Sequence, residues 1–287
     1  MKKMLKFLLP SLAISPLLVS CSVPSIKLEH NELEQKWDTF LQREYIANIL
    51  DLVFKDNQKA KQEYIKSQKE ISNEYIKRVN SALLFAANPI KSITTPSTLF
   101  GRKPFILTKS SREIKKFTRG SYSQDEEKYT GNWLWFLFNL DKVKFSGYPE
   151  YDKFLSPSDA TTADHLANTR NLGSFYKMKS NEMVQYVISE DEYSKIVYLL
   201  TKEGFIMEIR LTQDEDNLPL DVSIHTYIWT YKEIFNNKNL NEIFDIKAYS
   251  AIINNFEDKP IDRTLKVVYE EQYGGEPLRF TIFTLEE

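Results

Sequence analysis

Between residues 29 and 88, apolar side chains recur with the period of an amphipathic helix. In the first half they follow successive i+4 steps: Trp37, Leu41, Tyr45, Ile49 and Val53. The pair Asp56-Asn57 interrupts this stripe and can cap a second helix, whose apolar stripe runs from about 58 to 87. Asn88-Pro89 ends it, because a residue before proline disfavours helical backbone. Two amphipathic helices with a short turn predict an antiparallel helical hairpin.

After residue 132 the pattern changes to short runs rich in β-branched and aromatic residues, several of which alternate with polar neighbours. These runs are 183–189, 196–201, 205–211, 222–231, 265–271 and 278–285. Helical spacing returns once, near 241–254, and turns are expected at 202–204 and at Gly274-Gly275. The predicted fold class is therefore α+β, with an N-terminal amphipathic helical hairpin followed by a mainly antiparallel β-sheet.

The same patterns predict the domain organisation of the chain. We expect a signal peptide at 1–20, a lipidated tether at 21–28, the helical hairpin at 29–88, an irregular connector at 89–131, and a mainly β part at 132–287 with one helix near 241–254. The connector is assigned because it contains three prolines and many Ser and Thr residues.

The first 21 residues have the pattern of an export signal that ends in a lipid-attachment site. A lysine-rich start is followed by an uncharged apolar stretch at 7–19, which is shorter than the roughly 20 residues needed to cross a bilayer. The sequence Leu-Val-Ser-Cys at 18–21 resembles the bacterial lipobox. The alternative is an ordinary signal peptide with a chance cysteine, but Cys21 is the single cysteine of the chain and lies at the cleavage point. We expect an acylated Cys21 that holds the protein in the lipid bilayer at the extracellular face of the cell membrane.

Composition excludes several classes of function. The formal net charge is -2, and the basic run at 109–116 is short, so nucleic acid is not an expected partner. Only 8 glycines are present and no glycine-rich phosphate motif can be written, so no nucleotide cofactor is expected. One cysteine and 3 histidines do not supply a zinc site, and no metal is assigned.

Catalytic chemistry has one weak candidate. His165 follows Asp164, and an adjacent carboxylate could orient the imidazole for acid/base work. Adjacent residues seldom face each other in a regular element, so no catalytic residue is assigned, and the protein is expected not to be an enzyme. Carboxylate pairs for glycoside hydrolysis depend on the fold rather than on spacing, which leaves a hydrolase open.

Residues 131–140 form a dense aromatic block. As a strand it would be apolar on both faces, with Trp133 and Trp135 on one side and Phe136 on the other. A strand of this kind is normally covered on both faces, which favours a core role. The alternative is a groove for sugar, lipid or peptide, with Trp133, Trp135, Phe136 and the nearby Tyr148 as ligand-binding residues.

The lipobox, the absence of disulfides and the bias towards Lys, Asn, Ile, Phe and Tyr resemble the surface lipoproteins of mollicutes, the wall-less bacteria. The block at 131–140 is similar to what the aromatic cluster surface protein family would carry. This resemblance implies an outer-surface protein and transfers no catalytic residue.

The favoured function is a non-catalytic binding or interaction module at the outer face of the cell membrane, with a host or envelope protein as its partner. Two alternatives stay open: an accessory subunit of a membrane transport or secretion complex, docking through the helical hairpin, and, ranked third, an exported hydrolase.

Overall fold

The computed structural model describes residues 23–86, 114–123, 128–129, 131–147, 151, 154, 174–190, 194–213, 220–225, 227–255 and 260–286. Three residues singled out by the sequence, Cys21, Tyr148 and His165, lie outside these ranges. The chain divides into two compact units, Met1–Gln42 and Arg43–Glu287. Among the described residues, no helix combines the length and the apolar character needed to cross a bilayer.

The N-terminal helices are present, but the prediction of two continuous helices is wrong. The first stripe is divided between α1 (Val23–Leu41), in the first unit, and α2 (Glu44–Phe54), in the second. The break falls at Arg43, whose extended backbone (ψ 131°) cannot continue a helix. The second stripe is divided between α3 (Gln58–Lys69) and α4 (Asn73–Ala86).

The predicted cap before α3 is confirmed. The side chain of Asn57 accepts a hydrogen bond from the backbone N–H of Ala60 at 3.0 Å, which satisfies one of the donors that a helix start leaves unpaired.

Within the described residues the strands form one ten-stranded sheet. Its strands are β1 (Gly120–Ser123), β2 (Lys128–Tyr129), β3 (Val143–Gly147), β4 (Ser174–Lys177), β5 (Met183–Glu190), β6 (Ser194–Thr201), β7 (Ile206–Thr212), β8 (Asp221–Ile224), β9 (Ile228–Thr230) and β10 (Leu278–Leu285). The order is β2-β1-β8-β7-β9-β10-β3-β4, and β6 and β5 branch from β7. All these pairings are antiparallel, so the α+β class with helices first is confirmed.

Two predicted strands are helices instead. The run at 265–271 belongs to α12 (Pro260–Glu271), which begins with a proline at the position where helices tolerate it. The aromatic block forms the short helix α7 (Trp133–Phe138), followed by a 3-10 turn at Leu140–Lys142. The predicted run at 222–231 is two strands, β8 and β9, and not one.

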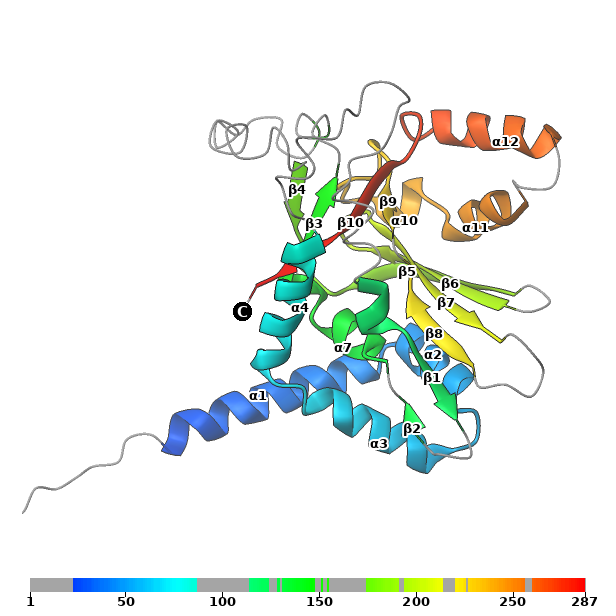
Figure 1. The fold of residues 1–287 in the computed structure, drawn as a ribbon. Coiled ribbons are helices and arrows are strands. Elements are labelled where there is room, and N and C mark those ends of the chain that lie inside the picture. The colour runs from blue at the N-terminus through cyan, green and yellow to red at the C-terminus, as the bar shows by residue number, and fades with distance from the viewer. Residues whose placement is uncertain are drawn as a thin grey trace, which may run out of the picture. The chain divides into compact units, whose positions relative to one another are not determined.

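The single helix predicted near 241–254 is divided between α10 (Leu240–Ile243) and α11 (Ile246–Asn255). α11 covers one face of the β5–β7 strands together with α12, while α2 and α7 lie on the other side (Figure 1). The covered face holds an aromatic core around Tyr231, in which Phe244 and the tyrosines of α11 and α12 pack ring against ring. This packing fixes β5 and β6 between two layers of helices.

Candidate functional site

A pocket of about 400 Å³, open to solvent on one side, lies where β5 begins. Four consecutive residues of that strand, Met183 to Tyr186, line it together with the preceding Glu182. The N-terminal end of α2 contributes Arg43, Glu44 and Tyr45, and the turn after β6 contributes Lys202. Because consecutive strand residues point to opposite faces, a wall made of four in sequence includes the backbone edge of the strand.

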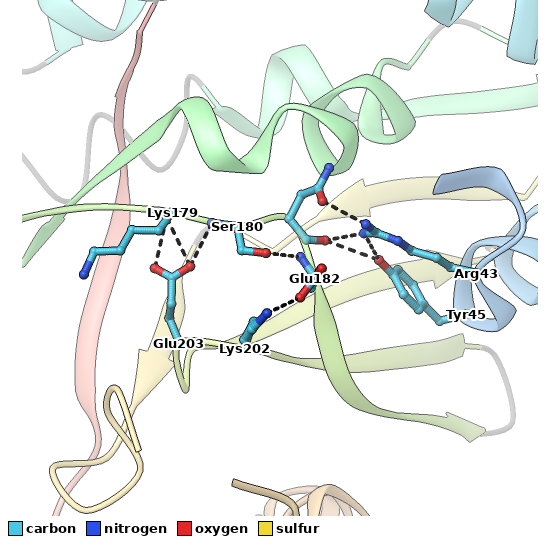
Figure 2. Close-up of polar contacts among 8 residues, drawn as sticks. Arg43, Tyr45, Lys179, Ser180, Glu182, Lys202 and Glu203 are labelled. Atoms are coloured by element: carbon cyan, nitrogen blue, oxygen red, sulfur yellow. Dashed lines mark hydrogen bonds and ion pairs between the residues drawn. The ribbon is translucent and has the colours of Figure 1, made fainter. Parts of the chain in front are cut away.

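Arg43 ties the start of α2 to the loop before β5 (Figure 2). One guanidinium nitrogen donates to the carbonyl oxygen of Asn181 at 2.6 Å and to the hydroxyl of Tyr45 at 3.1 Å. The other nitrogen donates to Oδ1 of Asn181 at 3.0 Å. The amide of Asn181 in turn donates to the carbonyl of Phe138 at 2.6 Å, at the end of α7. The planar guanidinium therefore holds the loop at fixed points, which a lysine could not reproduce.

Glu203 fixes the other end of this loop from the turn between β6 and β7. Its carboxylate is 6% exposed and accepts hydrogen bonds from the backbone N–H groups of Lys179, at 3.1 Å, and Ser180, at 3.0 Å (Figure 2). Burial, with a contribution from Glu203, raises the pKa of Tyr176, so that phenol stays protonated beside the carboxylate. Charge-assisted bonds to two backbone donors hold the loop that leads to the pocket residue Glu182.

The turn that carries Glu203 depends on the following glycine. Gly204 has φ +85°, and a Cβ at this position would lie 2.2 Å from the carbonyl oxygen of Ile234. Only glycine combines that backbone conformation with so close an approach. The predicted turn at 202–204 is therefore confirmed, and its glycine places the carboxylate of Glu203 under the loop.

The rim of the pocket carries an ion pair between Lys202 and Glu182, with 2.6 Å between Nζ and Oε2. Lys202 lowers the pKa of Glu182 through hydrogen bonding and charge, so this carboxyl is ionised at neutral pH. Both side chains are more than half exposed, at 60% for Lys202 and 52% for Glu182. The pair therefore adds little stability and can exchange partners.

The pocket lining includes two tyrosines, Tyr45 from α2 and Tyr186 from β5. The rings of Tyr45 and Tyr186 lie 6.2 Å apart, and the amide of Asn48 donates to the hydroxyl of Tyr186 at 2.9 Å. Burial raises the pKa of Tyr45, while its hydrogen bond from Arg43 opposes the rise. The lining thus combines aromatic faces, aliphatic strand residues and a balanced set of charges.

The structure places the predicted aromatic residues elsewhere, in the core. Trp133 is 0% exposed, Trp135 4% and Phe136 1%. The backbone N–H of Trp135 donates to the buried side chain of Gln68 at 3.2 Å, and its ring meets that of Tyr75 at 5.0 Å. In this arrangement their rings pack against helices rather than lining an open groove. Tyr148, like Cys21, lies outside the described residues.

The pocket residues were not predicted from the sequence. The sequence pattern did not single out Arg43, and its main partner, Asn181, is 138 positions away. Glu203 was assigned only to a turn. The one local sign was Lys202-Glu203-Gly204, where a carboxylate stands beside a glycine in a tight hairpin.

Comparison with known proteins shows that the chain belongs to a class of surface proteins. A family model described as aromatic cluster surface protein matches residues 22–274, and the chain belongs to this family. The predicted family is thereby confirmed, and cell-surface location follows from its description. No curated protein and no solved structure matches the chain.

Proposed function

We propose that this surface protein is a lipid-anchored, non-catalytic interaction module at the outer face of the cell membrane. The observation that carries the interaction role is the pocket whose wall includes four consecutive residues of β5, Met183 to Tyr186. Arg43, which lines the pocket, and Glu203 fix the loop that leads into β5, so the surface is already formed before a partner arrives. Preformed surfaces bind with less loss of conformational entropy than surfaces that must first be ordered.

The anchor is supported by the sequence at 1–21. A lysine-rich start, an apolar stretch and a lipobox ending in the single Cys21 match the requirements for diacylglyceryl transfer. Two acyl chains hold a protein on a bilayer far longer than one, because each buried CH₂ contributes about 0.8 kcal/mol.

The chemistry of the pocket supports binding rather than catalysis. Among the described residues that line it there is neither histidine nor cysteine nor serine. Glu182 is ionised because Lys202 lowers its pKa, so it is a poor proton donor at neutral pH. The phenol of Tyr45 has a raised pKa, which makes it a poor base.

A photo-crosslinking experiment on intact cells tests this role. A photoreactive amino acid replaces Tyr186, at the pocket, or the exposed Glu63, on α3, as the matched control. We expect a covalent adduct from position 186 that is absent from position 63. Equal labelling at the two positions, or none at 186, would contradict an interaction site at this pocket.

A further inference from the structure

β5 is an edge strand of the sheet that the described residues form. It pairs with β6, and within the described part of the chain no strand lies on its other side. From Met183 to Ser189 it contains no charge and no proline, and every one of these residues is half-exposed. Natural edge strands are commonly blocked by lysine, proline or a covering segment. The one irregularity, a register shift between Met183 and Gln185, lies at the pocket end and leaves the rest of the strand regular.

The hydrogen bonds of the neighbouring strand show which backbone groups of β5 face outwards. The N–H of Thr201 donates to Phe205, towards β7, while the N–H of Lys202 donates to Glu182, towards β5. Direction alternates along an antiparallel strand, so Leu199 and Val197 also turn towards β7. Their partners in β5 are Tyr186 and Ile188. The backbone N–H and C=O groups of Tyr186 and Ile188 therefore point to the open edge.

These outward groups suit a second β5 strand running antiparallel about a two-fold axis at Val187. In that register Tyr186 of each copy pairs with Ile188 of the other, and Val187 lies opposite its own counterpart. Gln185 lies opposite Ser189. An aromatic residue thus lies opposite a β-branched one, an aliphatic residue opposite its own copy, and a polar residue opposite a polar one. These are favourable cross-strand pairs. The two hydrogen-bonded pairs supply about four backbone hydrogen bonds.

We propose that the partner of this surface is a second copy of the chain, joined by antiparallel β5–β5 pairing about Val187 into one continuous sheet. The inference rests on the proposed function, since it names the partner for the same interaction surface. Tethering on a membrane confines the copies to two dimensions, which raises their effective concentration and favours such pairing.

Disulfide crosslinking in the membrane fraction reads this register directly. Opposed residues in a pair without hydrogen bonds have Cβ atoms about 5 Å apart, close enough for a disulfide after small adjustment. Val187→Cys should therefore give a covalent dimer on mild oxidation. Ser189→Cys is the matched control, because the two copies of position 189 would lie about 13 Å apart. Equal crosslinking at 187 and 189, or none at 187, would overturn the proposal.

A proline substitution separates pairing from folding. Ile188→Pro removes an N–H that points to the open edge, where proline is tolerated. In the Val187→Cys background it should abolish the dimer while the melting temperature stays close to that of the parent. Ile188→Val, which keeps the N–H, should crosslink as the parent does. A folded Ile188→Pro variant that still crosslinks fully would overturn the proposal.

The wild-type chain, whose single cysteine is Cys21, tests the lipid anchor separately from the β5 pairing. A covalent dimer of the wild type would mean that the thiol of Cys21 is free, which contradicts acylation and not β5 pairing. Retention in the membrane without any dimer at 187 would leave the anchor intact and overturn the pairing.

Discussion

Truncation of Trp133 tests the conclusion that the aromatic block is core. Trp133 is 0% exposed, and its ring lies 6.0 Å from that of Tyr64, so α7 packs on α3 through this contact. Removing a buried tryptophan typically lowers the free energy of unfolding by 3–5 kcal/mol, and we expect Trp133→Ala to lose about 4 kcal/mol. A domain is commonly stable by about 5–15 kcal/mol, so this variant would be close to unfolding at 37 °C.

Two further variants refine the magnitude. The indole N–H of Trp133 is buried and has no hydrogen-bond partner among the described residues. Trp133→Phe removes that unpaired donor, whose burial costs about 1–3 kcal/mol, and should therefore cost less than half as much as alanine. Trp229, on β9, is only half-buried, so Trp229→Ala serves as a control with a smaller loss.

Equilibrium urea unfolding followed by circular dichroism measures these changes, provided that the m-value stays constant. A loss below about 1 kcal/mol for Trp133→Ala, within the range of surface substitutions, would refute the core assignment. Lost partner capture by a fully folded Trp133→Ala variant would return the block to the role of a binding groove.

Four other substitutions probe the pocket scaffold and one titrating group. Glu203→Gln removes the buried charge and places an amide NH2 against the N–H of Lys179, and it should cost about 2 kcal/mol. Glu182→Gln, at an exposed pair, should cost less than about 1 kcal/mol; urea unfolding measures both. Gly204→Ala should cost about 3 kcal/mol, because a Cβ meets backbone and the residue has positive φ; a melting temperature unchanged from wild type would contradict this. Burial lowers the pKa of His225 despite the nearby Glu208, so the unfolded chain binds more protons below about pH 6.5. Stability should therefore fall as pH drops from 7 to 5.5, and melting curves of His225→Gln should lose this part of the pH dependence.

The fold class could be predicted from the sequence. Several strands are covered on only one face, so apolar and polar residues alternate along them. The block at 133–138 shows where that reasoning ends. Six consecutive apolar residues carry no period, so a buried helix and a buried strand have the same pattern. At 265–271, β-branched residues suggested a strand, yet Leu265, Val267 and Val268 are exposed on a helix that Lys266 and Glu270 support as an i,i+4 pair.

The pocket and the residues that fix it could not be predicted from the sequence, for a different reason. Arg43 meets Asn181 across 138 residues, and Glu203 meets Lys179 across 24, so neither clamp has a spacing that sequence alone could reveal. Charged residues in those positions are indistinguishable from solvated surface until the fold brings their partners together. The glycine of the turn was the one member whose role followed from local chemistry.

The central claim, a surface module anchored through lipid, is tested most directly by the intact mass of the protein isolated from the membrane fraction. We expect a chain that begins at Cys21 and carries a diacylglyceryl group on its sulfur. A chain that retains residues 1–20, or that begins elsewhere with a free thiol at position 21, would contradict the claim.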